Sequence, residues 1–163
     1  VYVCDYRRRG TMETLVAIMR YNGGALRKNE VRSLLETRDA MESMCMRLVV
    51  ERADAAGLEA LAPVLESIRA SRDNDEAAEN IFLFHHELAV LSGNVLMPLL
   101  YHSFRPQSVH LWSIDCKRSG IQRMYESKLT LYSALLNGDA DAAVRLTHER
   151  IRRAIDELSL YGA

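Results

Sequence analysis

The sequence predicts an all-α protein, an antiparallel bundle of about six to seven helices. Apolar residues recur at helical spacing along most of the chain, and the alternation typical of strands is nearly absent. Only three prolines and eight glycines interrupt the 163 residues, and the turns between the predicted helices are short. Short turns favour antiparallel neighbours in a bundle. A chain of this length with 48% hydrophobic residues can bury one core.

The predicted helices follow one another with recognisable starts and stops. Thr11, followed by Glu13 and Thr14, resembles a capping box at the start of the first helix, and Gly23 and Gly24 end it. The turn at 72–75 precedes an apolar helix that ends at Ser92. The other helices are expected at about 11–20, 27–53, 57–71 (kinked at Pro63), 95–114 (bent near Pro106), 120–136 and 140–160.

The first ten residues read differently from the bundle. "VYVCDYRRRG" alternates briefly and then turns basic, which is typical of the end of a strand followed by a linker. We therefore expect a linker at 1–10 and one helical domain at 11–163. The chain does not begin with methionine, so we expect a segment that precedes it to have been removed.

Composition excludes several classes of protein. The net charge of −1 gives no basic footprint for nucleic acid on this segment itself. Three cysteines, far apart and odd in number, indicate neither a zinc knuckle nor a disulfide framework. No apolar run reaches the length of a membrane span, and no signal peptide opens the chain. We expect a cytoplasmic protein with reduced thiols and no contact with a membrane.

Two cations occupy apolar helix faces. Lys128 lies between Met124 and Tyr132 on one stripe, and Arg38 lies within the stripe of the first long helix. An unpaired buried charge costs about 3–5 kcal/mol, so these cations require an explanation. Lys128 could extend its ammonium to solvent, and Glu42, four residues after Arg38, could neutralise the guanidinium.

Further polar side chains flank apolar faces. Arg150 and His148 border the stripe of the last helix, where both could be simple boundary residues. His85 and His86 have apolar neighbours on both faces of a central helix. A lone buried histidine is more often a core residue than a ligand, and adjacent histidines do not form a metal motif, which needs i, i+3 or i, i+4 spacing.

Four stretches together resemble one known family. "DYRRRGTMETL", "ETRDAMESMCMRLVVERA", "FHHELAVLSGN" and "LLNGDADAAVRLTHERI" are similar, in this order along the chain, to the C-terminal effector-binding domain (FCD) of FadR-like GntR-family transcription regulators. The resemblance implies a helical bundle that binds a small carboxylic acid or acyl derivative and forms a homodimer. It also implies a winged helix before Val1 that binds operator DNA. The effector-binding residues expected from it are Arg38, His85, Asn94, Lys128, Tyr132 and Arg150.

The sequence departs from the family at its metal site. Many members hold a divalent metal through an aspartate and three histidines. His85 matches the first histidine, but Ile81 stands at the aspartate position, and Lys128 and Arg150 stand at the other two. His148 is a poor substitute, because two residues turn it far from Arg150 on a helix. We therefore expect no metal and no other cofactor, and we expect the two cations to attract an effector anion directly.

Three functions remain open from the sequence. The first is an effector-sensing and dimerising domain of a transcription regulator that is not an enzyme. The second is a helical enzyme that uses His85 or His86 as a base. The third is a dimerisation module without a ligand, in which Lys128 and Arg38 reach solvent or pair internally.

Overall fold

The computed structural model describes residues 6–11, 13, 14, 17 and 27–157. This part of the chain is helical and contains no strand. Seven of its helices have at least seven residues, which confirms the expected all-α bundle. The helices are α1 (Tyr6–Arg9), α3 (Lys28–Arg52), α4 (Ala55–Glu59), α5 (Ala62–Arg69), α6 (Asn74–Leu91), α7 (Met97–Ser103), α8 (Arg105–Ser119), α9 (Ile121–Leu136) and α10 (Ala140–Asp156).

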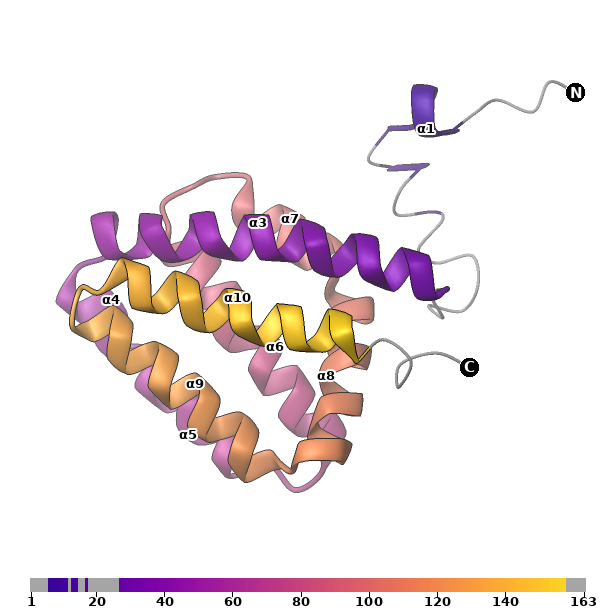
Figure 1. The fold of residues 1–163 in the computed structure, drawn as a ribbon. Helices are drawn as coiled ribbons and strands as arrows, with labels where there is room; N and C mark the ends of the chain where they lie inside the picture. The colour runs from indigo at the N-terminus through magenta and orange to yellow at the C-terminus, as the bar shows by residue number, and fades with distance from the viewer. Residues whose placement is uncertain (1–5, 12, 15–16, 18–26, 158–163) are drawn as a thin grey trace, which may run out of the picture.

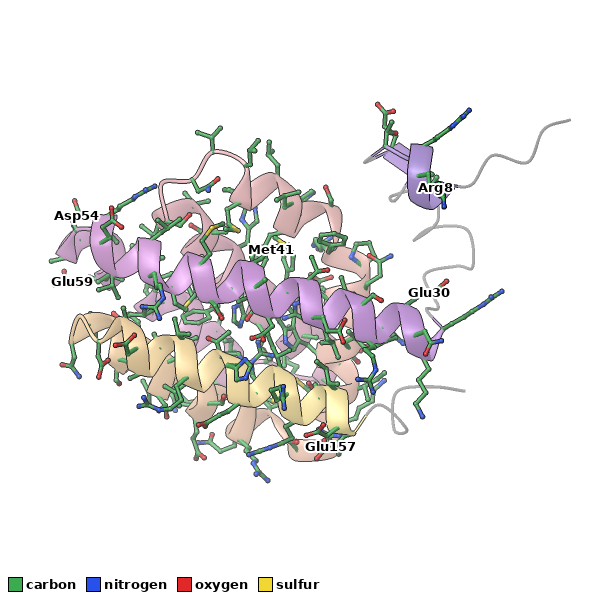
Figure 2. The ribbon with its side chains drawn as sticks, turned by 45° about the horizontal axis from the view of Figure 1, so that its top comes forward. Arg8, Glu30, Met41, Asp54, Glu59 and Glu157 are labelled. Atoms are coloured by element: carbon green, nitrogen blue, oxygen red, sulfur yellow. The ribbon has the colours of Figure 1, made fainter. Side chains whose placement is uncertain are left out.

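Two long helices from opposite ends of the domain lie side by side. α3 and α10 run antiparallel along one face in both views (Figure 1, Figure 2). α6 packs against α3, α5, α7 and α8, while α9 packs against α5, α8 and α10. The bundle therefore brings α3, α6, α8, α9 and α10 around one interior. No helix within the described ranges is long and apolar enough to cross a membrane.

Prolines divide two predicted helices that we expected to be continuous. The kink expected at Pro63 is a break between α4 and α5, and Pro63 lies in the first turn of α5. Likewise, the bend expected near Pro106 is a break between α7 and α8, with Pro106 in the first turn of α8. Proline lacks an N–H, so it fits a first turn, where that group has no partner within the helix, better than a helix interior.

Most of the remaining helix boundaries agree with the sequence. The Asp73 carboxylate accepts from the N–H groups of Asp75 and Glu76 and starts α6, as expected for the turn at 72–75. Asp139 accepts from the N–H of Ala142 and starts α10. Carboxylates at this position satisfy N–H groups that the helix itself leaves unpaired. α3 and α9 occupy the predicted ranges, whereas α8 continues to Ser119, five residues beyond the predicted end.

Only part of the predicted N-terminal structure falls within the described residues. The proposed strand at 1–4 and most of the helix at 11–20 lie outside the described residues. Tyr6–Arg9 forms one helical turn, α1, which lies apart from the bundle (Figure 1). The boundary at residue 10 between linker and domain stays a prediction.

A polar layer separates two apolar clusters inside the bundle. The larger cluster includes Cys45, Met46 and Val49 of α3, and the smaller one includes Val31, Leu34 and Leu35 of the same helix. Arg38 and Glu42 lie between these two sets along α3, and both are buried. On α10, Thr147 and Arg150 similarly lie between Ala143 of the larger cluster and Ala154 of the smaller one.

Candidate functional site

Glu42 is the centre of the polar layer, and its side chain is fully buried. Arg38, one turn earlier on α3, donates through Nε and Nη2 to Glu42 Oε1 over 3.0 and 2.7 Å. Arg150 of α10 donates through Nη2 to Glu42 Oε2 over 2.7 Å. One carboxylate therefore holds two guanidinium groups and links α3 to α10. The hypothesis that Glu42 neutralises Arg38 is confirmed.

The charges around Glu42 decide its ionisation. Burial raises the pKa of the Glu42 carboxyl, but Arg38, Arg150 and His85 outweigh burial and hold that pKa well below its usual range. Glu42 is therefore ionised at neutral pH. Two guanidinium groups and one carboxylate leave one surplus positive charge in the cluster before Lys128 is counted. A buried ion pair of this kind is tolerated because its groups are hydrogen-bonded to each other.

Trp112 of α8 contacts two members of the cluster. The His85 ring stacks on it with centroids 5.1 Å apart, and the Arg38 guanidinium carbon lies 4.5 Å from the centroid of the Trp112 ring. His85 Nδ1 is 3.7 Å from Glu42 Oε2, too far for a hydrogen bond. Burial lowers the pKa of His85 well below its ordinary value; Glu42 opposes this shift and the nearby cations add to it. His85 is thus a neutral ring inside the bundle.

Lys128 of α9 is enclosed by the bundle. The residue is 1% exposed, so the hypothesis that it extends to solvent is wrong. It forms no salt bridge with any residue that the structure describes. Burial, followed by the charge of Arg150, holds the pKa of Lys128 well below its usual range. Its amine therefore gives up its proton far more easily than an exposed lysine.

A pocket of about 120 Å³ reaches this lysine from outside. At about 30 Å³ per water molecule, its volume corresponds to roughly four waters, enough for a small organic acid. Arg150 borders the pocket and also binds Glu42, so it connects the pocket with the polar layer. The residues that line the pocket are Ser127, Lys128, Thr130, Leu131, Leu146, Thr147 and Arg150.

Several buried polar atoms have no hydrogen-bond partner among the described residues. Among them are Thr147 Oγ1, Trp112 Nε1, Tyr101 Oη and both ring nitrogens of His85. Buried polar groups are nearly always paired, so such a group needs an explanation. Thr147 is 2% exposed and lines the pocket beside Lys128. A polar ligand in this pocket would supply the missing partner of its hydroxyl.

The structure brings together four of the six residues expected from the sequence. Arg38 and Arg150 bind Glu42, His85 Nδ1 lies 3.7 Å from it, and Lys128 lines one pocket with Arg150. Asn94 is not in this group: its Oδ1 accepts from the N–H groups of Leu96 and Met97 over 3.0 and 3.3 Å, at the start of α7.

Tyr132 also lies away from the cluster. Its ring is buried, and burial, followed by the charge of Glu59 in α4, raises the pKa of its hydroxyl. Tyr132 follows Lys128 by one helical turn on α9, and the surroundings of its side chain are different there. No interaction among the described residues joins Tyr132 to Glu42.

Sequence reasoning missed part of this site. Glu42 was expected only as a partner of Arg38, although it also binds Arg150 of a helix more than one hundred residues away. Trp112 and Thr147 were not expected at all. Thr147 lies in the apolar stripe of the last helix, which was a usable signal for a buried hydroxyl. For Trp112, the usable signal was that it is the only tryptophan of the chain.

A divalent metal does not fit these residues. Ile81, at the position that matches the family's aspartate, belongs to the apolar core, and the guanidinium of Arg150 would repel a cation. His148 is half exposed and contacts Asp39, with Nδ1 2.8 Å from Oδ2. Within the described ranges, no group of three or more His, Cys, Asp or Glu side chains could hold a metal. Elemental analysis of protein purified without a metal-affinity tag remains the test.

Replacing Lys128 by methionine should stabilise the empty protein by about 1–3 kcal/mol, because a buried amine without a full set of partners is removed.

Lys128 should also make the stability of the wild-type protein depend on pH, and the sign of this dependence is definite. The unfolded chain binds a proton on Lys128 up to about pH 10.5, whereas the folded state releases it at lower pH. Wild type should therefore gain stability with rising pH in this window, and Lys128→Met should not. Denaturant unfolding at several pH values measures both effects; equal slopes would contradict the buried, neutral lysine.

The fold and the interior define a known class of domain. The family model of the FCD domain matches residues 33–153, and the chain belongs to this family. The chain is also 28% identical over 145 residues to the HTH-type transcriptional regulator LutR of Bacillus subtilis (strain 168). The alignment covers 83% of this chain and 65% of LutR, so the chain spans just under two thirds of that relative. The resemblance that the four motifs indicated is thereby confirmed.

Proposed function

We propose that this domain senses a small organic carboxylate or acyl metabolite for a transcription regulator, through the pocket beside Lys128 and Arg150. A winged helix that precedes Val1 in the parent protein would bind operator DNA, and the effector would modulate that binding. The observation that carries this proposal is the pocket itself, which is lined by a buried amine, a guanidinium and an unpartnered hydroxyl.

The electrostatics of the pocket favour an anion. Glu42 binds both Arg38, as the sequence allowed, and Arg150, which the sequence-based hypothesis had treated as a free cation for the effector. One surplus positive charge nevertheless remains next to the pocket. A carboxylate that contacts Arg150 from the pocket side would complete the neutralisation through short, charge-assisted hydrogen bonds. Lys128 and Thr147 would add donors from the pocket wall.

A thermal-shift screen with carboxylates and phosphates tests the proposal. A ligand at about 100 times its dissociation constant should stabilise the wild-type domain by roughly 2.7 kcal/mol. Lys128→Met and Arg150→Met should respond weakly or not at all to the same ligand. Arg145→Met is a matched control, because Arg145 is exposed on α10 and does not line the pocket. If both pocket variants respond as fully as wild type, the ligand binds elsewhere and the proposed site is wrong.

The regulatory part of the proposal concerns the whole protein. We propose a homodimer, because a two-fold dimer places one winged helix on each half of a palindromic operator. Such a regulator would act in the cytoplasm. A mobility-shift assay of the parent protein on its operator, with and without the ligand found in the screen, tests the coupling between effector and DNA. Light scattering tests self-association.

The alternative functions have less support from the site. His85 is a neutral ring stacked on Trp112, and His86 packs on Phe82 with centroids 5.8 Å apart. Neither histidine forms a hydrogen bond with a described residue, so neither is oriented as a general base would be. A dimerisation module without a ligand would not need the pocket beside Lys128.

A further inference from the structure

Lys128 combines features that rarely occur together in a lysine with a purely structural role. It is almost completely buried, it has no carboxylate partner among the described residues, and it borders a pocket. Burial and the neighbouring Arg150 lower the pKa of its amine. A lysine that is desolvated next to another cationic group is the form that reacts with carbonyl compounds.

The groups around the amine would recognise a particular arrangement of ligand atoms. Arg150 can hold a carboxylate at the pocket wall, and the Thr147 hydroxyl has no partner and lies within the same wall. Lys128 and Arg150 line the same pocket of about 120 Å³, so a ligand whose carbonyl is directly next to its carboxylate suits both groups. A simple carboxylic acid or a hydroxy acid offers no such electrophile.

We propose that Lys128 binds a small 2-oxo acid covalently, as an imine, with the acid's carboxylate held by Arg150. This inference rests on the proposed function and specifies the ligand class of the same pocket. The neutral amine adds to the carbonyl carbon and forms a carbinolamine. Loss of water then leaves a carbon–nitrogen double bond; the carbonyl oxygen departs with the two hydrogens of the amine. No oxidant or reductant is required, and hydrolysis reverses the reaction.

Two exposed lysines of the same chain allow the reactivity of Lys128 to be compared within one protein. The chain contains three lysines, and Lys28 and Lys117 are exposed. An exposed lysine is almost fully protonated at neutral pH. Each unit by which the pKa falls raises the fraction of neutral amine about tenfold. Because Lys128 is desolvated beside Arg150 at the pocket whereas Lys28 and Lys117 are exposed, at least about ten times more imine should form on Lys128 than on either of them.

Reductive trapping tests the proposal on the wild-type protein. The protein is incubated with pyruvate and sodium borohydride, which reduces an imine to a stable secondary amine. Intact-mass measurement should show one adduct, equal to pyruvic acid less one oxygen atom, and peptide mapping should place it on Lys128. Lactate with borohydride should give no adduct, because lactate lacks the carbonyl. Arg150→Met should trap much less pyruvate, and Lys128→Met should lose the single specific adduct.

The outcomes separate this inference from the proposed function. If pyruvate and lactate both stabilise the protein but no adduct forms, the imine is refuted and the carboxylate-sensing function stands. An adduct spread evenly over the three lysines also refutes the imine at Lys128. If no carboxylate of the panel binds at all, the proposed function fails together with the imine.

Discussion

Replacing Glu42 by glutamine should lower the free energy of unfolding by about 3–5 kcal/mol, the usual effect of removing one partner of a buried ion pair. Glutamine keeps the shape of the side chain but removes the charge that Arg38 and Arg150 share. Arg38 is 3% exposed and would keep its charge without a carboxylate. The loss should appear in denaturant unfolding as a lower midpoint with little change in slope.

Two further variants sharpen this prediction. Glu36→Gln is the matched control: Glu36 is exposed on the same helix, and its replacement should change stability by less than about 0.5 kcal/mol. Replacing Arg38, Glu42 and Arg150 together by methionine or leucine should restore most of the lost stability, because apolar residues of similar volume often replace a buried ionic cluster at no cost. If Glu42→Gln and Glu36→Gln behave alike, the Glu42 cluster does not hold α3 and α10 together.

Acidification should weaken the fold, beginning near pH 6.5, and His85 should cause the first part of this loss. The folded state keeps His85 neutral, whereas the unfolded chain binds a proton on it below pH 6.5. Its contribution to stability is therefore present above pH 6.5 and declines as the pH falls. Glu42 adds a second loss of the same sign below pH 4.5, since its folded pKa is lowered. Each unit of lowering corresponds to about 1.4 kcal/mol.

Fluorescence of Trp112, which contacts both Arg38 and His85, offers a convenient signal for this acid unfolding. His85→Phe keeps an aromatic ring against Trp112 but cannot titrate, so it should flatten the dependence of stability on pH between 6.5 and 4.5. His110→Gln removes an exposed histidine and should leave the dependence unchanged. An equal dependence in wild type and His85→Phe would show that His85 is not held neutral by the fold.

The helices were predictable from the sequence because each depends on local signals. The Asp73 and Asp139 caps and the periodic apolar faces are all readable within one turn of the chain. Pro63 and Pro106 were predicted to bend helices but start new ones, since the choice between a kink and a break depends on how the neighbouring helices pack. Tertiary contacts of that kind are not visible in a local pattern.

The site was predictable only in part, for a similar reason. Arg38 and Lys128 were conspicuous because a charge on an apolar stripe breaks the helical pattern, and the match to the family placed His85 and Arg150 near them. The joint pairing of Glu42 with Arg38 and Arg150 requires α3 and α10 to lie side by side. Asn94 was included among the effector-binding residues because of its motif, whereas in the structure its side chain accepts a hydrogen bond at the start of α7.

The central claim is that a carboxylate effector binds between Lys128 and Arg150, and calorimetric titration tests it most directly. The ligand selected by the thermal-shift screen is titrated into wild type, Arg150→Met and Arg145→Met. Wild type and Arg145→Met should bind one carboxylate per chain with equal affinity, whereas Arg150→Met should bind at least about tenfold more weakly, a loss of about 1.4 kcal/mol or more. Equal affinity for wild type and Arg150→Met would contradict the claim.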